Sequence, residues 1–291
     1  MDSTPNHEIL LVGPGLNGER VVAMADTLWQ HTFEIQEQSW LFEPSAVRLR
    51  CRRADTVHDD LRSHLMNEAE KHGLDAFVLA AARPRPRLMV FDMDSTLIQA
   101  EIIDELAGLA GVKERVSAIT ERAMRGEINF RGALAERLAL LRGLPEERLK
   151  ELLARVQLSE GLEALMLGLR AAKVKTAIIS GGFGFFGRHL QQRLGFDHLF
   201  CNELEIVDGM LTGRVGAEIV DASRKVASLK MIADQEDIPL EQVVAVGDGA
   251  NDLPMMQLAG LGVAYRAKPV VRAAAQYRLS CGTLDSLLHL L

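Results

Sequence analysis

Asp92 and Asp94 are the residues of this chain whose types and spacing most directly suggest chemistry. They follow the apolar run Leu88–Phe91, one residue separates them, and Ser95 and Thr96 add hydroxyls directly afterwards. Carboxylates this close repel each other unless a cation or a proton shares the site. The spacing therefore predicts a catalytic centre, and the alternative is a pair of ordinary turn residues at the end of a strand.

Two later segments have the same organisation, an apolar strand followed by polar or flexible residues. Residues 175–179 lead into Ser180-Gly181-Gly182, and residues 242–246 lead into a loop that contains Asp248, Asn251 and Asp252. In a parallel sheet, these strand ends open onto the same edge as Asp92. The oxygens of Asp92 and Asp248 then predict a Mg²⁺ site.

The remaining groups at this edge suit a phosphate. Ser180 supplies a hydroxyl, the glycines after it let backbone amides approach an anion, and Lys225 adds a positive charge. An acidic nucleophile, a cation, a lysine and amide donors together fit phosphoryl transfer through an aspartyl-phosphate. Taken singly, the glycine pair could mark an ordinary helix start, Lys225 could be a solvated lysine, and Asp252 could cap a helix.

The first 82 residues have the pattern of a small α/β domain. Apolar alternation and turn residues predict strand-helix-strand-strand-helix-strand, the order of a ferredoxin-like sandwich. The predicted strands are 8–13, 34–42, 46–51 and 74–81, and the predicted helices are 19–30 and 56–72. The second and third strands are joined near Glu43-Pro44-Ser45.

Residues 83–87, R-P-R-P-R, predict a linker, because alternating prolines disfavour both helix and sheet. A solvated hinge is favoured over a basic binding patch at this length. Residues 88–291 then form a second domain in which strands alternate with helices. This alternation indicates a doubly wound, Rossmann-like parallel sheet.

A helical block of about 101–160 interrupts that sheet directly after the Asp92 strand. Glycines at 111, 126 and 143 separate the predicted helices 104–110, 113–125, 130–141 and 145–156. A helical insertion after a catalytic strand predicts a cap over the site.

Composition restricts the classes of function. The chain has 33 basic and 40 acidic residues, and the net charge of −7 argues against a general nucleic-acid binder. No apolar run reaches the roughly 20 residues of a membrane span, and the N-terminus lacks the basic flank and apolar core of a secretion signal. Cys51, Cys201 and Cys281 have no metal-ligand spacing, which favours reduced, structural thiols in the cytoplasm.

Several motifs together resemble the haloacid-dehalogenase-like hydrolase superfamily and, within it, the phosphoserine phosphatases. They are D-M-D-S-T-L-I-Q-A-E from Asp92, A-M-R-G-E-I-N-F from Ala123, I-S-G-G-F from Ile179 and V-G-D-G-A-N-D from Val246, in this order. The resemblance covers about Leu88 to the C-terminus. It implies a Mg²⁺-dependent enzyme that hydrolyses O-phospho-L-serine to L-serine and phosphate, the last step of serine biosynthesis.

The resemblance also implies a role for each matching residue. Asp92 attacks phosphorus, and Asp94 is first the general acid and then the base. The metal is held by Asp92, the backbone carbonyl of Asp94, and Asp248. Ser180, Gly181, Lys225 and Asn251 bind the phosphate, and Asp252 orients Lys225 and the water around the metal. In the cap, Glu101 pairs with the substrate ammonium, Arg137 pairs with its carboxylate, and Met124 and Phe130 shape the pocket.

The residues of the cap carry these roles only through the resemblance. On their own, Glu101 and Arg137 could be surface charges, and Met124 and Phe130 could be core residues of the cap. Two other functions therefore stay open beside a phosphoserine phosphatase. One is turnover of another small phosphate ester such as phosphohomoserine, and the other is a non-catalytic amino-acid sensor built on the same scaffold.

The N-terminal pattern resembles the amino-acid-binding, ACT-like domain that precedes the catalytic part in many bacterial members. In such domains the loop after the first strand carries an Asp ahead of a Pro-Gly pair. Here that loop is G-P-G-L-N-G at residues 13–18, without the Asp. This departure favours dimerisation or scaffolding, with a homodimer as the expected assembly, over binding of serine.

Overall fold

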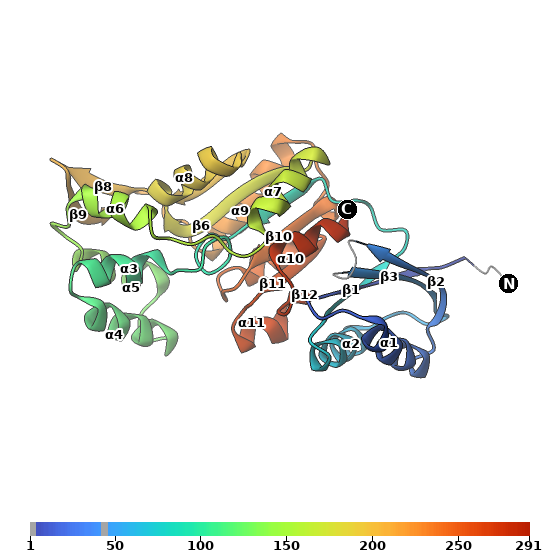
Figure 1. Cartoon of the computed structure of the whole chain (residues 1–291). Helices are drawn as coiled ribbons and strands as arrows, with labels where there is room; N and C mark the ends of the chain where they lie inside the picture. Colours follow the sequence, from blue (N-terminus) through green and yellow to red (C-terminus); the bar gives the residue numbers. More distant parts are fainter. Residues whose placement is uncertain (1–3, 42–45) are drawn as a thin grey trace. The chain divides into compact units, whose positions relative to one another are not determined.

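The computed structural model of the chain describes residues 4–41 and 46–291. Figure 1 shows its helices and strands, and by their contacts the residues divide into two compact units. The first unit comprises Met1–Arg87, Glu160–Val174 and Pro239–Leu291, and the second comprises Leu88–Ser159 and Lys175–Ile238. The predicted limits of the N-terminal domain, the linker and the cap divide the chain differently and stay predictions.

The strands predicted for the N-terminal domain form an antiparallel sheet in the first unit. β1 (His7–Val12) lies between β3 (Ala46–Arg52) and β4 (Asp75–Ala80), and β2 (Glu34–Leu41) is the edge strand beyond β3. This is the strand arrangement of a ferredoxin-like sandwich. The predicted join at Glu43-Pro44-Ser45 lies outside the described residues.

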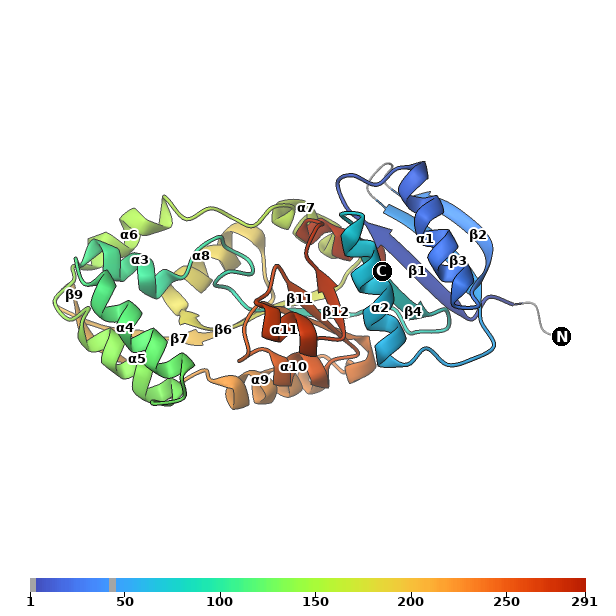
Figure 2. The same ribbon diagram turned by 90° about the horizontal axis from the view of Figure 1, so that it is seen from below.

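Two helices cover one face of this sheet, and Figures 1 and 2 show them side by side. They are α1 (Gly18–Gln30) and α2 (Asp59–Lys71). α1 begins where it does because the side chain of Asn17 accepts the N–H of Arg20. Apolar side chains of both helices pack on buried residues of β1, β3 and β4, which form the core of this region.

The last strands of the chain belong to the same unit and are bonded to the N-terminal sheet. The carboxylate of Asp75, at the start of β4, accepts the N–H groups of Ser280 (2.8 Å), Cys281 (2.9 Å) and Gly282 (2.7 Å). The hydroxyl of Tyr277 donates to the carbonyl of Val78 at 2.6 Å. Residues about 200 positions apart therefore hold each other in place.

The proline-arginine segment predicted as a solvated hinge is anchored within the first unit. Arg83 is half-buried and lies 3.7 Å from Glu8 of β1. Gln242 donates to the carbonyl of Arg85 at 3.2 Å, and its own carbonyl accepts the N–H of Arg87 at 2.8 Å. Both ends of the segment therefore have partners within the first unit, while Pro84, Arg85 and Arg87 are exposed, and its role as a hinge stays a prediction.

Three short parallel strands complete the first unit. β10 (Val243–Gly247) pairs with β11 (Leu261–Tyr265), which pairs with β12 (Tyr277–Leu279). All five residues of β10 are buried, as expected for a strand covered on both faces. The accompanying helices are α7 (Leu162–Ala171), η1 (Leu240–Gln242), α10 (Leu253–Leu258), α11 (Pro269–Ala274) and η2 (Leu284–Leu290).

The second unit has its own parallel strands, β5 (Leu88–Phe91), β6 (Lys175–Phe183) and β7 (His198–Asn202). β5 is wholly buried, as its unbroken apolar run predicts. α8 (Gly184–Leu194) follows β6, and α9 (Ala222–Gln235) follows the hairpin described below. Both units thus contain parallel strands joined through helices, which confirms the predicted fold class.

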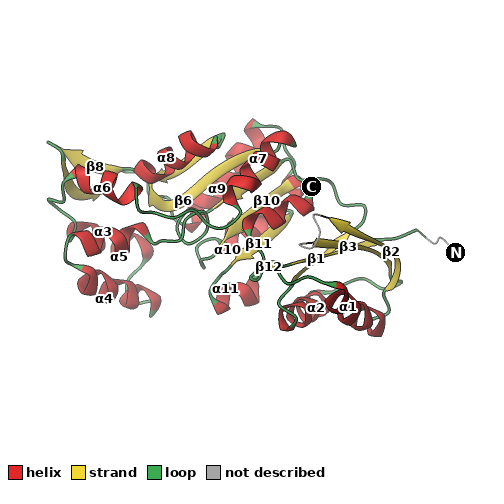
Figure 3. Ribbon diagram, in the orientation of Figure 1, coloured by secondary structure: helices red, strands yellow, loops and turns green. Residues whose placement is uncertain are grey.

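Four helices follow the β5 loop without an intervening strand, as the cap prediction requires (Figure 3). They are α3 (Ile102–Leu109), α4 (Lys113–Met124), α5 (Phe130–Ala139) and α6 (Glu146–Leu153). The glycines at 111, 126 and 143 all have positive φ, between 69° and 83°, which explains why the helices stop there.

A β-hairpin packs against these helices. β8 (Leu204–Val207) and β9 (Met210–Val215) are joined by Asp208-Gly209, and both turn residues have positive φ, as a two-residue type I′ turn requires. The N–H of Leu211 donates to the carbonyl of Leu144 at 2.9 Å. The predicted helical cap therefore includes a hairpin from later in the chain.

The remaining sequence expectations concern cysteines and membranes. Cys51, Cys201 and Cys281 are all free thiols, in agreement with the prediction. Among the residues that the structure describes, no helix combines the length and the apolar character needed to cross a bilayer.

Candidate active site

Asp92 lies at the carboxyl end of β5, where the buried strand meets a tight loop. Its Oδ1 accepts the N–H of Met93 at 2.8 Å and lies 2.9 Å from Nζ of Lys225. The Lys225 side chain is fully buried, and that of Asp92 is almost so. A desolvated ammonium at this distance stabilises the negative charge of the carboxylate.

Lys225 is positioned by the start of α9. α9 begins at Ala222, because the carboxylate of Asp221 accepts the N–H of Arg224 at 3.0 Å. Lys225 therefore lies in the first turn, and its side chain reaches the end of β5.

Asp94 lies in a loop that wraps around one carbonyl group. The carbonyl of Met93 accepts the N–H groups of Thr96, Leu97 and Ile98, and Ser95 has a left-handed φ of 56°. Burial, followed by the charges of Glu101 and Asp92, raises the pKa of Asp94 well above its usual 3.8. Asp94 therefore keeps its proton to a higher pH than an exposed aspartate does.

One oxygen of Asp94 is notable because Oδ1 is buried and has no hydrogen-bond partner among the described residues. A buried, unsatisfied polar atom costs free energy in the folded protein. Such an atom suits a group whose partner arrives with a ligand.

Ser180-Gly181-Gly182 lies beside this loop. Phe91 pairs with Ile178, so β6 carries Ser180 to the end of β5. Ser180 is buried, and its Oγ accepts the N–H of Gly182 at 3.0 Å. A Cβ on Gly182 would lie 2.6 Å from the Met93 side chain and 3.1 Å from the Asp94 carboxylate, so the close approach requires glycine.

The loop after β10 carries the other predicted strand-end residues. Asp252 is fully buried and stands just before α10, but its side chain does not cap that helix. It folds back, and Oδ2 accepts the N–H of Gly249 at 3.0 Å. Asn251 is half-buried in the same loop.

Asp92, Asp248 and Asp252 form a group that could hold a metal ion, with one carboxylate oxygen of each within 4.8 Å of the others. All three are buried. Oxygen donors with several negative charges suit a hard divalent cation such as Mg²⁺. The set contains the predicted pair of Asp92 and Asp248 together with Asp252, and their role as metal ligands stays a prediction.

Glu101 and Arg137 are held by polar partners in the cap. Glu101 immediately precedes α3, and its Oε1 accepts the hydroxyl of Ser95 at 2.8 Å. Arg137 on α5 donates from Nε to the carbonyl of Ala133 at 3.2 Å, and burial lowers its pKa. The charge of Glu101 opposes that lowering. Neither side chain is an isolated surface charge.

The two apolar cap residues differ. The aromatic ring of Phe130 lies 3.2 Å from the position that a Cβ would take on Gly181, which places Phe130 against the predicted phosphate loop. Met124, at the end of α4, is 74% exposed, so the alternative of a core residue is wrong for it.

Two polar contacts of the site were missed from the sequence. Arg131 of α5 donates from Nε and Nη2 to Oδ2 of Asp221, at 3.0 and 2.8 Å, which ties the cap to the start of α9. Ser95 holds Glu101 as described above. The sequence shows the hydroxyl of Ser95. It does not show the left-handed backbone conformation that turns this hydroxyl toward Glu101, because serine is not a residue type that indicates such a conformation.

Comparison with known proteins decides the family. The family model described as haloacid dehalogenase-like hydrolase matches residues 89–257, which is more than half of the chain. The chain belongs to this hydrolase family. The match spans the Asp92 loop, the cap, the Ser180 loop and the Asp248 loop.

Curated relatives show to which group within the haloacid dehalogenase-like hydrolases the chain is similar. It is 49% identical to the phosphoserine phosphatase of Archaeoglobus fulgidus over 234 residues, 80% of this chain and 68% of that relative. It is 41% identical to the phosphoserine phosphatase of Streptomyces coelicolor over 285 residues, 97% of this chain and 70% of that relative. The chain is therefore a hydrolase of the phosphoserine phosphatase group.

A solved structure shares the whole fold. A HAD family hydrolase from Salmonella enterica serovar Typhi superposes with a TM-score of 0.90 at 30% identity, and the match covers 98% of both chains. The N-terminal sheet therefore occurs together with the hydrolase core in that protein too.

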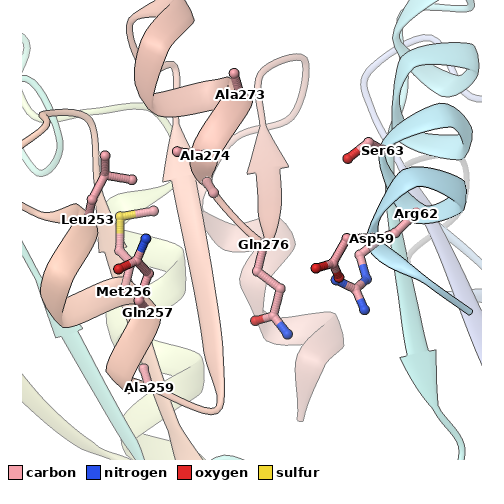
Figure 4. Close-up of a pocket in the computed structure, with 11 residues that line it drawn as sticks. Asp59, Arg62, Ser63, Leu253, Met256, Gln257, Ala259, Ala273, Ala274 and Gln276 are labelled. Carbon is pink, nitrogen blue, oxygen red and sulfur yellow. The ribbon is translucent and has the colours of Figure 1, made fainter.

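The first unit of this hydrolase also has a cavity of about 450 Å³, lined by α2, α10 and α11 (Figure 4). Two of its polar side chains have partners within the same unit. Arg62 lies 2.7 Å from Asp59, and the side-chain oxygen of Gln276 accepts the N–H of Gly262 at 3.2 Å. The cavity contains none of the predicted site residues and is not the active site.

Proposed function

We propose that this chain hydrolyses O-phospho-L-serine to L-serine and phosphate, the last step of serine biosynthesis, through an aspartyl-phosphate on Asp92. The observation that carries the proposal is the contrast between two neighbouring carboxyl groups. Asp92 lies 2.9 Å from the Lys225 ammonium, whereas burial raises the pKa of Asp94. A nucleophile must be ionised and a general acid must hold a proton. The names of the relatives support the same reaction.

In the first step, a carboxylate oxygen of Asp92 attacks phosphorus. The bond from phosphorus to the serine oxygen breaks, and Asp94 gives its proton to that oxygen. The buried Oδ1 of Asp94, which lacks a partner among the described residues, supports this role. In the second step, Asp94 is ionised and takes a proton from the water that attacks the aspartyl-phosphate, which releases phosphate and restores Asp92.

The phosphate would be bound by Ser180, Gly181, Lys225 and Asn251. Because Oγ of Ser180 already accepts the N–H of Gly182, its own hydrogen is available to donate to a phosphate oxygen. Mg²⁺ would be held by Asp92, Asp248 and the backbone carbonyl of Asp94, with Asp252 orienting Lys225 and the bound water. When bound, it would neutralise charge on the transferred phosphate.

The cap would select the amino acid. Glu101 would pair with the ammonium of phosphoserine and Arg137 with its carboxylate, while Met124 and Phe130 would shape the pocket. The position of Phe130 beside Gly181 supports this division, because it brings the cap next to the phosphate loop. Arg137 is buried enough for a carboxylate partner to matter.

Arg137→Ala tests the choice of substrate. We expect kcat/KM for O-phospho-L-serine to fall about 30- to 1000-fold, the equivalent of about 2 to 4 kcal/mol for a desolvated charge pair. Turnover of an aryl phosphate, which has no carboxylate, should stay within about threefold of wild type. Arg125→Ala is the matched control, because this cap arginine is exposed and pairs with Glu121 and Glu127.

Several outcomes contradict the proposal. Equal losses on both substrates would show that Arg137 does not bind the substrate carboxylate. Faster turnover of phosphohomoserine than of phosphoserine would favour the other ester, and absence of phosphate release from every ester would favour the sensor. Appreciable activity of Asp92→Asn would exclude the covalent intermediate.

The N-terminal domain is included in the proposal as an ACT-like domain that forms a homodimer of a cytoplasmic enzyme. Its edge strand β2 is largely exposed, and Trp29 on α1 is 76% exposed. Edge strands and exposed aromatic residues are common in contacts between copies. Analytical ultracentrifugation of the full chain and of Trp29→Glu tests this, since a monomeric wild type would exclude the dimer.

A further inference from the structure

Asn202, the last residue of β7, has a fully buried side chain that is hydrogen-bonded at both ends. Its Nδ2 donates to the carbonyl of Gly181 at 2.7 Å, and its Oδ1 accepts the N–H of Val220 at 2.8 Å. A carbonyl can only accept and an N–H can only donate, so the orientation of the amide is fixed. One side chain therefore connects the C-terminal part of β6 to the segment before α9.

The first bond acts on Ser180 through a rigid peptide group. The carbonyl of Gly181 and the N–H of Gly182 belong to the same planar unit, so holding one fixes the direction of the other. That N–H donates to Oγ of Ser180 at 3.0 Å. Asn202 thus determines which lone pair of the Ser180 hydroxyl is occupied, and hence where its hydrogen can point.

The second bond acts on Lys225. Val220 is followed by Asp221, whose carboxylate caps α9, and Lys225 lies in the first turn of that helix. The ammonium of Lys225 is 2.9 Å from Asp92. The position of the Val220 backbone therefore sets where α9 starts and where Lys225 meets the nucleophile.

We propose that Asn202 is a positioning residue that fixes the spacing between the two phosphate-binding elements, the Ser180–Gly182 loop and the start of α9. It touches neither the substrate nor the metal-binding carboxylates in this role. The inference rests on the proposed function only in taking Ser180 and Lys225 as the groups that bind phosphate.

Asn202→Asp keeps the volume, removes the amide donor and adds a carboxyl group, and the uncharged Asn202→Ser is measured beside it to separate the loss of the donor from the added charge. One carboxylate oxygen can still accept from Val220, but the other faces the Gly181 carbonyl, and two acceptors repel. We expect kcat/KM to fall about 10- to 100-fold, as for residues that hold metal ligands in position, and the inhibition constant of inorganic phosphate to rise by a similar factor.

Thr176→Val is the matched control. Thr176 is also buried, lies on β6, and donates its hydroxyl to Asp197 at 3.0 Å, far along the strand from the phosphate loop. Both variants lose a buried hydrogen bond and should lower the melting temperature. Only Asn202→Asp should raise the inhibition constant of phosphate, and Thr176→Val should stay within about twofold of wild type.

An inhibition constant within about twofold of wild type for Asn202→Asp, or an equal rise in Thr176→Val, overturns the proposal. If Asn202→Asp does not fold, Asn202→Ser, which is smaller and uncharged, is judged alone by the same limits. The inhibition constant is measured with an aryl phosphate as substrate. Failure of the chain to hydrolyse phosphoserine would therefore contradict the proposed function without affecting this test.

Discussion

Replacing Asp75 by alanine tests how the N-terminal sheet is held in the first unit. The side chain is 1% exposed, and its carboxylate accepts three successive N–H groups, from Ser280, Cys281 and Gly282, at 2.7 to 2.9 Å. Alanine removes every acceptor at once. The donors lie more than 200 residues later in the chain, so the substitution separates the two ends of the unit without touching the active site.

The magnitude follows from how well water can replace the lost carboxylate. The region around Gly282 is buried, so its N–H bears the full cost of an unsatisfied donor, about 1 to 3 kcal/mol. Ser280 and Cys281 are half-buried, and water can recover part of their bonds. We expect Asp75→Ala to lower the free energy of unfolding by about 3 to 5 kcal/mol. Asp75→Asn keeps the acceptor that serves Cys281 and Gly282, and should lose about 1 to 2 kcal/mol.

Urea unfolding measures these changes, and tryptophan fluorescence reports on the relevant region because both tryptophans, Trp29 and Trp40, lie in the N-terminal sheet and its helices. Asp59→Ala is the control, since Asp59 is 90% exposed and its single ion pair with Arg62 contributes at most about 1 kcal/mol. An Asp75→Ala variant within about 0.5 kcal/mol of wild type would refute the reasoning.

Three further predictions follow from contacts described above. Arg131→Ala removes the ion pair between the cap and Asp221. Because Arg131 is 59% exposed, we expect only about a two- to fivefold rise in KM for phosphoserine. The rise should be smaller at high salt, which screens this pair in the wild type. Chelation by EDTA should abolish phosphate release, and added Mg²⁺ should restore it. Asp248→Asn should raise the Mg²⁺ concentration for half-maximal activity more than about tenfold, since it removes a charged ligand. Turnover that does not depend on metal would contradict both expectations. Burial raises the pKa of Asp75 above its usual 3.8, so the folded protein binds this proton more tightly than the unfolded chain does. The wild type should therefore lose stability relative to Asp75→Asn as the pH rises from 3.8 through the raised pKa. Urea unfolding curves of both proteins across that pH range check the sign of this change.

Much of the site could be predicted from residues that follow apolar strands. Asp92, Ser180 and Asp248 each follow a buried run, and a parallel sheet brings such ends together. Asn202 follows the same rule but was missed, because its strand, H-L-F-C-N, is short, begins with a histidine and is only half-buried. The rule fails where the strand itself cannot be recognised.

Other features depend on contacts that no local pattern contains. Asp75 lies inside the predicted strand 74–81, and its partners are a serine, a cysteine and a glycine near the end of the chain. Backbone N–H groups occur in every residue type except proline, so the sequence gives no indication of which ones converge. The anchoring of the proline-arginine segment by Gln242 has the same origin.

The division of the chain between its units has a consequence for synthesis. The first unit is assembled from the first 87 residues, a short middle segment and residues 239–291, so it can be completed only after residues 239–291 have been synthesised. The second unit ends at Ile238 and has all its residues earlier. A nascent chain therefore carries the N-terminal sheet with Asp75 unpaired for most of translation. A chain that stops before Ser280 lacks all three donors to that carboxylate. Removal of residues 280–291 should therefore destabilise the N-terminal sheet first, although that sheet is formed by the opposite end of the sequence.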